Sequence, residues 1–380
     1  MRILHVITDL RTGGVPLHLY RLARHLHERG DQVRVVSLSP PGPVTGLLGQ
    51  AGVAVGACDA AGWWDARVFP RLAAAIRTFR PPVVHALLFH ANLAARVACP
   101  LAGVDPRRLI CEIQTVEIER RWHLAVDRLT QGGCRLVVGN SPAVIEHLAR
   151  RAGIARSRLR LIRGGVDAEA IATARPLDRA ELGLHPGTPL VLWVGRLDPI
   201  KGLDVLLDAV TIARHQHAVQ LAIVGDGPLA GELGRAIRAG GLGDVVHLLG
   251  ARHDVPRLLR TADVFCFPSR TEGLPNALIE AMAAGLPVVT TNAPGCRDLV
   301  EHGRTGWLVP VDDARAAGAA LVRFLRDPAL ASRLGAAAAG HVSRNLSLKQ
   351  CFENYRALYR EVCRSLPATG NAARCTSGAV

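Results

Sequence analysis

Residues 264–290 read VFCFPSRTEGLPNALIEAMAAGLPVVT. An apolar run at Val264–Pro268 is followed by a loop, by a helical stretch over 276–284, and by a second apolar run at Pro287–Thr290. Short apolar strands joined through a helix are typical of a parallel sheet that is covered on both faces. The stretch therefore predicts one strand–helix–strand unit of such a sheet.

The same alternation continues outward from this unit. In the second half of the chain, further strands are predicted at Leu190–Val194, Gln220–Val224 and Val245–Leu248, with helices over 203–214, 229–239, 255–261, 295–301 and 314–326. In the first half, strands are predicted at Ile3–Ile7, Val33–Leu38, Val83–Leu87, Arg108–Ile113 and Leu136–Gly139, with helices over 16–29, 68–79, 91–101 and 142–152. The fold class is therefore α/β, with two doubly wound parallel sheets in series.

The boundaries follow from the gaps in this pattern. Two prolines and the absence of an apolar run predict a linker between the sheets. A stripe of Phe352, Tyr355, Leu358 and Tyr359 at helical spacing predicts a final amphipathic helix. We predict a first domain at 1–168, a linker at 169–188, a second domain at 189–345, the final helix at 346–366 and a disordered tail at 367–380.

Charge is uneven along the chain. The protein has 46 Lys and Arg against 32 Asp and Glu, for a formal charge of +14, and residues 1–170 alone hold 23 Arg against 13 acidic residues. Such an excess predicts an anionic partner: a membrane surface, a nucleic acid or an anionic substrate. Because aromatic residues make up only 4% and no nucleic-acid motif is present, we do not expect nucleic acid to be that partner.

Cysteines and apolar runs bear on the compartment. The nine Cys residues form no CxxC pair, which argues against a zinc site or a disulfide framework and fits a reducing compartment. The N-terminal apolar run ends at Asp9 and is too short for a signal peptide, and no run of about 18 apolar residues occurs. We expect a cytoplasmic protein that is at most peripheral to the inner face of a membrane.

Two strand–helix loops have anion-binding chemistry. Gly13 and Gly14 follow the first strand, where glycine lets backbone N–H groups approach an anion at a helix N-terminus. Arg196 and Lys201, in GRLDPIKG, are two cations between two glycines after the first strand of the second sheet, which suits a phosphate clamp. Taken alone, each loop could equally be an ordinary turn or a solvated basic loop.

A third loop, Glu272–Glu280, carries two acids around a helix start. Pro275 can occupy the first helical turn, so the backbone N–H groups of Gly273–Asn276 are expected to face a diphosphate. Glu272 lies ahead of the helix and Glu280 on it, so that they can reach the sugar and the ribose hydroxyls of one ligand. For Glu280, the alternative is an acid that only complements the helix dipole.

Several of these segments together resemble a known family. EGLPNALIEAMAAGLPVV, GRLDPIKG, VGDGP, FPSRTEG and GRTGWLVP are similar to motifs of glycosyltransferase family 4, the group 1 glycosyl transferases. The resemblance covers about residues 1–365. It implies a retaining GT-B enzyme with two Rossmann-like domains facing across a cleft and a final helix that crosses back to the first domain. It also implies a nucleoside-diphosphate sugar as donor, no cofactor and no metal, and the sequence has no DxD motif in a metal-binding context.

The resemblance also implies residue roles. Glu272 matches the acid that contacts the donor sugar near the reacting carbon, and Glu280 matches the acid that binds ribose. The other donor-binding positions it implies are Gly13, Gly14, Arg196, Lys201, Gly227, Arg252, Gly273, Leu274, Pro275 and Asn276, with Asp226 beside the base.

One position departs from the family pattern. Many members place a His after the strand that corresponds to Arg108–Ile113, whereas this chain has Gln114, which can hydrogen-bond a sugar but cannot titrate. A general base would then lie elsewhere, and His85 and His90 are the candidates, with structural histidines as the alternative. The catalytic set is thus Glu272, His90 and Gln114.

The acceptor is expected on the first domain, where the positive charge lies. Trp63, Trp64, Phe69 and nearby arginines surround one predicted helix, and Glu119–Trp122 form a second group. Such groups suit an interfacial helix on anionic lipid, or a solvated basic face. We therefore predict a hexosyltransferase acting on a glycan or lipid-linked acceptor in envelope or exopolysaccharide biosynthesis. The alternatives are a GT-B nucleotide-sugar epimerase and a non-catalytic family member that serves as a scaffold.

Overall fold

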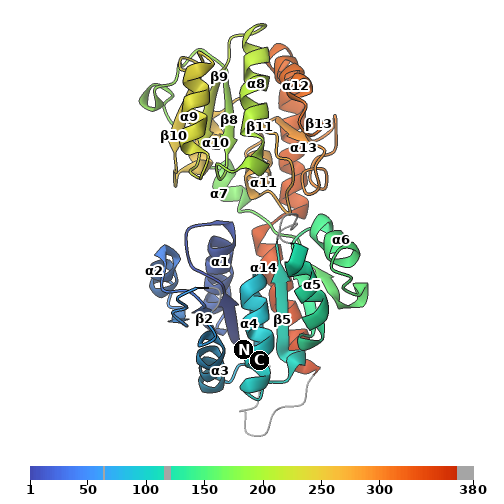
Figure 1. Cartoon of the computed structure of the whole chain (residues 1–380). Coiled ribbons are helices and arrows are strands. Elements are labelled where there is room, and N and C mark those ends of the chain that lie inside the picture. Colours follow the sequence, from blue (N-terminus) through green and yellow to red (C-terminus); the bar gives the residue numbers. More distant parts are fainter. Residues whose placement is uncertain (63–64, 115–120, 366–380) are drawn as a thin grey trace. The chain divides into compact units, whose positions relative to one another are not determined.

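The computed structural model describes residues 1–62, 65–114 and 121–365 (Figure 1). The chain divides into two compact units. The first comprises Met1–Arg163 and the C-terminal segment from Cys351, and the second comprises Gly164–Gln350. Each unit is an α/β structure with its own apolar core.

A parallel seven-stranded sheet organises the first unit, in the order β3-β2-β1-β4-β5-β6-β7. Its central strands are largely apolar and are buried along most of their length, as expected for a sheet with helices on both faces. The strands are β1 (Arg2–Ile7), β2 (Gln32–Ser37), β3 (Ala54–Ala57), β4 (Val83–Leu87), β5 (Leu109–Ile113), β6 (Leu136–Gly139) and β7 (Leu159–Leu161).

The helices of the first unit connect successive strands, and the final helix joins them. They are α1 (Gly14–Glu28), α2 (Pro43–Gln50), α3 (Val68–Phe79), α4 (Phe89–Leu101), α5 (Arg121–Thr130) and α6 (Pro142–Arg150). Helix α14 (Leu348–Arg364) is drawn with this unit in Figure 1. Its aromatic stripe, including Tyr355 and Tyr359, is buried. Its outer residues also contact the unit, because Arg356 Nε donates to Asp31 Oδ2 at 3.0 Å.

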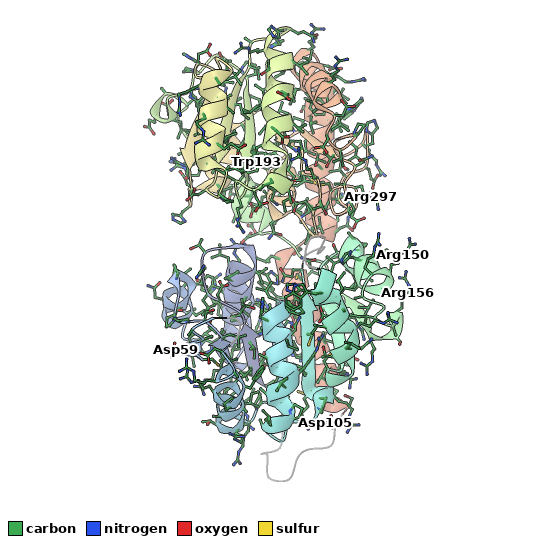
Figure 2. All side chains as sticks on the ribbon, in the orientation of Figure 1. Asp59, Asp105, Arg150, Arg156, Trp193 and Arg297 are labelled. Carbon is green, nitrogen blue, oxygen red and sulfur yellow. The ribbon has the colours of Figure 1, made fainter. Side chains whose placement is uncertain are left out.

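The second unit contains a parallel six-stranded sheet in the order β10-β9-β8-β11-β12-β13. The strands are β8 (Leu190–Val194), β9 (Gln220–Val224), β10 (Val246–Gly250), β11 (Val264–Phe267), β12 (Val288–Thr291) and β13 (Trp307–Val309). The helices are α7 (Ala168–Ala172), α8 (Leu203–Arg214), α9 (Ala230–Ala239), α10 (Val255–Thr261), α11 (Asn276–Ala283), α12 (Ala314–Arg326) and α13 (Pro328–Asn345). Helices α8 and α12 lie side by side on one face, and Trp193 lies inside the unit (Figure 2).

The predicted fold class, two parallel-sheet α/β units, is confirmed. Three strands escape the sequence pattern: β3, β7 and β13, which are short and each form an edge of their sheet, where continuous burial is not required. The helix predicted at 295–301 is wrong. These residues form turns, because Gly295 has φ +81° and a Cβ there would come within 2.7 Å of the Glu272 carbonyl oxygen.

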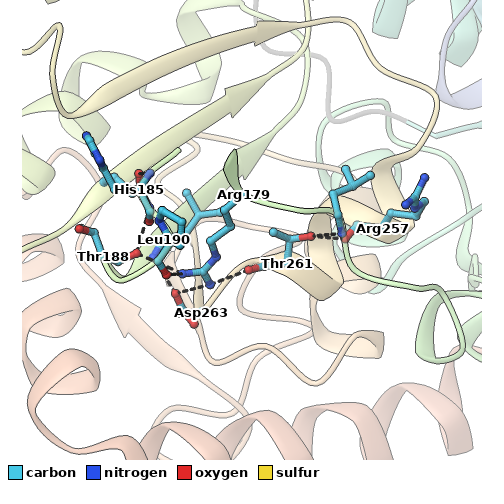
Figure 3. Close-up of polar contacts among 10 residues, drawn as sticks. Arg179, His185, Thr188, Leu190, Arg257, Thr261 and Asp263 are labelled. Carbon is cyan, nitrogen blue, oxygen red and sulfur yellow. Dashed lines mark hydrogen bonds and ion pairs between the residues drawn. The ribbon is translucent and has the colours of Figure 1, made fainter. Parts of the chain in front are cut away.

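The predicted linker segment, 169–188, lies in the second unit, where it is hydrogen-bonded to the sheet and to α10 (Figure 3). Arg179 Nη2 donates to the carbonyl oxygen of Thr261 at 2.7 Å and to Asp263 Oδ2 at 2.8 Å. The same Asp263 oxygen accepts from the backbone N–H of Leu190 at 2.7 Å. One carboxylate thus joins the segment to the first strand of the second sheet.

None of the helices in the described residues has the length and apolar character needed to cross a membrane. Seven cysteines of the described residues, Cys58, Cys99, Cys111, Cys134, Cys266, Cys296 and Cys351, are buried free thiols.

Candidate functional site

The loop after β8 positions Lys201 at the carboxyl end of the second sheet. A short 3-10 turn, Pro199–Lys201, ends at Gly202, which has φ +65°. A Cβ on Gly202 would lie 2.1 Å from the carbonyl oxygen of Pro268, the residue that follows β11. Only glycine combines this left-handed backbone with so close an approach, so Gly202 holds the Lys201 loop against the end of β11.

Lys201 and Glu272 form an ion pair in this position. Lys201 Nζ lies 2.6 Å from Glu272 Oε1, and the two side chains are 18% and 10% exposed. The ammonium group also lies 5.6 Å from the centre of the Phe267 ring. A largely buried pair at the carboxyl end of a parallel sheet lies where ligands bind in open α/β folds.

Arg270 fixes the same two loops from the outside. Its guanidinium donates to the carbonyl oxygen of Pro199 at 2.6 Å, to Asp204 Oδ2 at 2.6 Å and to Asp312 Oδ1 at 2.7 Å. It therefore ties the Lys201 loop to the start of α8. The sequence reasoning did not single out Arg270, although its place in FPSRTEG next to Glu272 could have drawn attention to it.

Helix α11 begins at Asn276, directly after the Glu272 loop. Pro275 occupies the N-cap position, and its side chain makes no capping hydrogen bond. The first-turn N–H groups therefore face the loop with the partial positive charge of a helix N-terminus. Glu280 follows on α11 and is half-buried.

Cys296 lies close to the Lys201–Glu272 ion pair but is not a candidate nucleophile. Burial, with a smaller contribution from the charge of Glu272, raises the pKa of its thiol to about 12. The thiol is fully buried and stays protonated at neutral pH, so it is not a nucleophile there.

The loops after β8 and β9 pack together beside this pair. The backbone N–H of Leu197 donates to the carbonyl oxygen of Asp226 at 3.0 Å, and a Cβ on Gly227 would lie 2.5 Å from the carbonyl oxygen of Leu197. Arg196 is 71% exposed, with its Nε 3.7 Å from Asp198 Oδ2. Its guanidinium is therefore accessible to an anion in solution.

Arg252, predicted to flank the base, is paired with an acid. Its Nε and Nη2 donate to the two carboxylate oxygens of Asp254 at 2.8 and 2.6 Å. This bidentate pair lowers the pKa of Asp254, chiefly through the hydrogen bond from Arg252. A ligand that used Arg252 would compete with Asp254 for it.

Gly13 and Gly14 lie in the first unit, at the start of α1. Gly13 has an extended backbone and Gly14 is the first helical residue. The side chains of Arg196, Lys201, Glu272 and Glu280 all belong to the second unit. The second unit alone therefore supplies the cations and acids of the predicted donor site.

Gln114 follows β5 in the first unit and is held by a buried acid, Glu112. Gln114 Nε2 donates to Glu112 Oε1 at 2.5 Å, and the Tyr355 hydroxyl donates to the same oxygen at 2.8 Å. His85 Nε2 lies 2.9 Å from Glu112 Oε2. Burial favours the neutral acid, but the contacts with His85 and Gln114 outweigh it and lower the pKa of Glu112.

His85, a candidate general base from the sequence, is instead a structural residue. It is fully buried, and its Nδ1 lies 2.8 Å from the Tyr359 hydroxyl. A substrate cannot reach it. His90, in contrast, is half-buried in the first turn of α4, where its ring meets Phe89 and His123 edge-on at 5.3 and 5.8 Å.

The two acceptor-side groups are only partly described. Trp63, Trp64, Glu119 and Arg120 lie outside the described residues. The Trp122 side chain is 53% exposed and packs edge-on against Phe89 at 5.3 Å.

The arginines beside α3 hold the local fold. Arg67 pairs with Asp65 at 2.8 Å, while Arg71 and Arg77 donate to the carbonyl oxygens of Cys58 at 2.6 Å and Leu101 at 3.0 Å. These contacts leave their positive charge in place but fix their side chains.

Sequence reasoning missed the role of Glu112. The available signal was an acid inside an otherwise apolar strand, CEI at 111–113. An acid at such a position needs polar partners around it. Gln114, two residues further on, and Tyr355, from α14, donate to Oε1, and His85, from β4, lies 2.9 Å from Oε2. The pattern of the strand could show the acid but not its partners.

The site of the second unit can bind an anion and neutralise it. Lys201, Arg196 and the N-terminus of α11 are positive, and Glu272 provides an adjacent carboxylate. Within the residues that the structure describes, no group of three His, Cys, Asp or Glu side chains is arranged to hold a metal ion. The positive groups are suited to stabilise a leaving phosphate group, and the neighbouring carboxylate of Glu272 could accept hydrogen bonds from a polar ligand.

The fold and this site place the chain in the GT-B class of two-unit α/β proteins. The crystal structure of Anabaena Alr3699/HepE in complex with UDP and glucose matches with a TM-score of 0.84 and 23% sequence identity, covering 95% of this chain and 100% of that one. The family model described as Glycosyltransferase Family 4 matches residues 12–170, and that described as Glycosyl transferases group 1 matches residues 188–327.

Two relatives support the same assignment. The 2-deoxystreptamine N-acetyl-D-glucosaminyltransferase of Streptomyces fradiae is 30% identical over 356 residues, which are 81% of this chain and 82% of that protein. The amylovoran biosynthesis glycosyltransferase AmsK of Erwinia amylovora is 42% identical over 143 residues, which span only 35% of each protein. The chain belongs to glycosyltransferase family 4, the group 1 glycosyl transferases.

Proposed function

We propose that the protein is a retaining, metal-independent glycosyltransferase that moves a hexose from a nucleoside-diphosphate sugar to a hydroxyl of a glycan or lipid-linked acceptor. The observation that carries this proposal is the Lys201–Glu272 pair at the carboxyl end of the second sheet, in the loop that leads to the N-terminus of α11. A cation and a helix N-terminus suit a diphosphate, and the neighbouring carboxylate suits the sugar attached to it.

In the proposed reaction, the bond between the anomeric carbon and the diphosphate oxygen breaks, and the acceptor hydroxyl oxygen bonds to that carbon. The hydroxyl proton passes to the departing nucleoside diphosphate. Lys201 and Arg196 stabilise the negative charge that develops on the leaving group, and Glu272 stabilises the positive charge on the sugar. Glu280, further along α11, holds the ribose.

The names of similar proteins support the substrate classes. HepE is described in complex with UDP and glucose, and AmsK is named for amylovoran biosynthesis. From these names we infer that this protein uses a nucleotide-sugar donor. We also infer a role in exopolysaccharide or envelope biosynthesis, on the cytoplasmic side of the membrane. The exposed Trp122 ring offers an apolar face for the acceptor.

The decisive experiment is a transfer and donor-hydrolysis assay with UDP, GDP and ADP sugars, preceded by a thermal-shift screen that selects the donor. We expect Lys201→Ala and Glu272→Ala to lose turnover, and EDTA to leave the wild-type rate unchanged. Unchanged turnover in both variants would remove the roles given to Lys201 and Glu272. Absence of both transfer and donor hydrolysis in the wild type would remove the enzymatic interpretation. Interconversion of the donor sugar without transfer would identify an epimerase instead.

Association with an anionic membrane is a separate part of the proposal. It is supported by the excess of arginine over acid in residues 1–170. Flotation with anionic vesicles at low salt tests it directly. Failure to co-float would exclude the membrane surface as a partner while leaving the transfer reaction open.

A further inference from the structure

Glu112 is held in one place by both its backbone and its side chain. It is fully buried at the end of β5. Asn92, on α4, donates from Nδ2 to the Glu112 carbonyl oxygen at 2.9 Å, and its Oδ1 accepts from the Glu112 backbone N–H at 3.3 Å. The Tyr355 hydroxyl and His85 then meet the two carboxylate oxygens. Such a group has little freedom to move, which suits a support for another side chain.

The carboxylate dictates how the amide of Gln114 is turned. An ionised carboxylate can only accept hydrogen bonds, and an amide donates only from its nitrogen. Gln114 therefore directs Nε2 at Glu112 Oε1, at 2.5 Å, and its carbonyl oxygen away from Glu112. Without the acid, the amide could present either its oxygen or its NH₂ group outward.

Gln114 is the accessible end of this network. Glu112, His85, Tyr355 and Tyr359 are buried, whereas Gln114 is half-buried and follows β5 at the carboxyl edge of the first sheet. Ligands of open α/β sheets bind beyond this edge. The outward carbonyl oxygen is therefore in a position to accept a hydrogen bond from a ligand.

We propose that Glu112 is a positioning residue that fixes the Gln114 amide so that its carbonyl oxygen accepts a hydrogen bond from a sugar hydroxyl of the donor or of the acceptor. This inference rests on the proposed glycosyltransferase function. It replaces a titrating base at this position with a neutral acceptor whose direction is set by a buried acid. A carbonyl oxygen fixed in this direction selects a substrate whose hydroxyl group can donate a hydrogen bond to it.

Substitutions of Gln114 test the required chemistry without disturbing the buried acid's own backbone contacts. A neutral His at this position can donate one ring N–H to Glu112 and offer the other ring nitrogen outward, whereas Leu can do neither. We expect Gln114→Leu to raise the KM of one substrate or to lower kcat, with kcat/KM falling about tenfold, the equivalent of one hydrogen bond. Gln114→His should restore most of the rate.

The substrate whose KM rises identifies the source of the hydroxyl. A higher KM for the nucleotide sugar assigns it to the donor, and a higher KM for the acceptor assigns it to the acceptor. Gln131→Ala, at a half-buried glutamine of the same unit whose side-chain NH₂ donates to the Arg128 carbonyl oxygen, is the matched control. Rates and both KM values of Gln114→Leu within twofold of wild type would overturn the proposal.

A double-mutant cycle tests the link between the two residues. Glu112→Gln should lower kcat/KM by about the same factor as Gln114→Leu, and the double variant should lose no more than either single variant. Tyr359→Phe removes a hydroxyl from the same buried network without touching Glu112 and should keep the wild-type rate. If the losses of the two single variants multiplied in the double variant, the role of Glu112 would be merely structural. The same would follow if Tyr359→Phe lost as much kcat/KM as Glu112→Gln.

A readout independent of activity separates this inference from the proposed function. If the wild-type protein transfers no sugar, the proposed function fails. The Gln114 side-chain NH₂ resonances, followed by NMR, should still show slow exchange in the wild type and fast exchange in Glu112→Gln. Fast exchange in the wild type would overturn the positioning role by itself.

Discussion

Lys201 Nζ and Glu272 Oε1 lie 2.6 Å apart, although 71 positions separate the two residues along the chain. The close approach of Gly202 to Pro268 and the hydrogen bond from Arg270 to the Pro199 carbonyl oxygen hold the two loops together. A ligand diphosphate that reaches Lys201 therefore meets an ammonium group already next to a carboxylate.

Removal of the Lys201 ammonium should weaken donor binding. A hydrogen bond between charged groups contributes about 1.5–3 kcal/mol, so Lys201→Ala should lower kcat/KM for the donor by roughly 10- to 150-fold. The measurement is steady-state transfer at varied donor concentration. The matched control is Lys349→Ala, because Lys349 is the other lysine of the chain and is exposed on α14. Equal effects of the two substitutions would contradict the role given to Lys201.

Glu272→Gln should separate binding from turnover. The amide keeps the size of the side chain but removes the negative charge, so the loss should fall on the charged transition state rather than on the bound donor. We expect kcat to fall by about 10²–10³-fold while the donor Kd, measured by calorimetry, changes by less than about threefold. Glu301→Gln, at an exposed acid of the same unit, is the control. A Kd that rises in proportion to the loss of rate would assign Glu272 to ground-state binding.

The sequence could predict the sheets because most of their strands are short, largely apolar runs. Four strands, such as Val83–Leu87 and Gln220–Val224, have the predicted bounds. The edge strand Leu159–Leu161 was not predicted, since its residues are half-buried or exposed and no periodic signal marks them. The segment 295–301 misled because its turn is set by a contact between Gly295 and the Glu272 loop, which a local pattern does not contain.

The candidate site, like the fold, could be predicted only in part. Lys201 and Glu272 stood out as a cation and an acid in glycine-containing loops, and the structure brings their side chains together. The support around Gln114 could not be predicted, because Glu112, Tyr355 and His85 come from β5, α14 and β4. Local spacing carries no information on contacts between such distant segments.

Stability of the first unit should fall in mild acid because of His5. Burial, reinforced by the charges of His85 and His18, holds the pKa of His5 well below its usual value of 6.5. In the unfolded chain His5 takes up a proton below about pH 6.5, whereas the folded unit does not, so stability is present above that pH and is lost as pH falls. The loss is up to about 1.4 kcal/mol per pH unit for one such group.

Hydrogen exchange of peptides from β1 and β4, measured between pH 7.5 and 5.5 and corrected for intrinsic rates, would report this effect. His5→Leu, which cannot take up a proton, should reduce the pH dependence by about one group's share. His215→Leu, at an exposed histidine of the second unit, should leave it unchanged. An unaltered pH dependence in His5→Leu would assign the acid sensitivity to other groups.

Arg179→Ala should loosen the segment at 169–188. The substitution removes donors to the Thr261 carbonyl oxygen and to Asp263, and the lost hydrogen bonds cost about 1–3 kcal/mol. For a unit of this size that corresponds to a fall in Tm of roughly 2–12 °C. Limited proteolysis should cut within the segment earlier than in wild type. Arg304→Ala, which removes an exposed pair with Glu301, should change neither measurement.

Gly202→Ala tests whether the close approach to Pro268 positions Lys201. Gly183 offers a matched site, because it has φ +70° and no atom within 4 Å of a Cβ built there, whereas at Gly202, with φ +65°, that Cβ would lie 2.1 Å from the Pro268 carbonyl oxygen. Both alanines incur the cost of a left-handed backbone, about 1 kcal/mol, but only Gly202→Ala must also move the loop. Donor kcat/KM should therefore fall about tenfold or more in Gly202→Ala and stay near wild type in Gly183→Ala, because a displaced ammonium no longer meets the diphosphate in the productive geometry. If both variants lost stability equally and kept full donor kcat/KM, the position of Lys201 would not depend on Gly202.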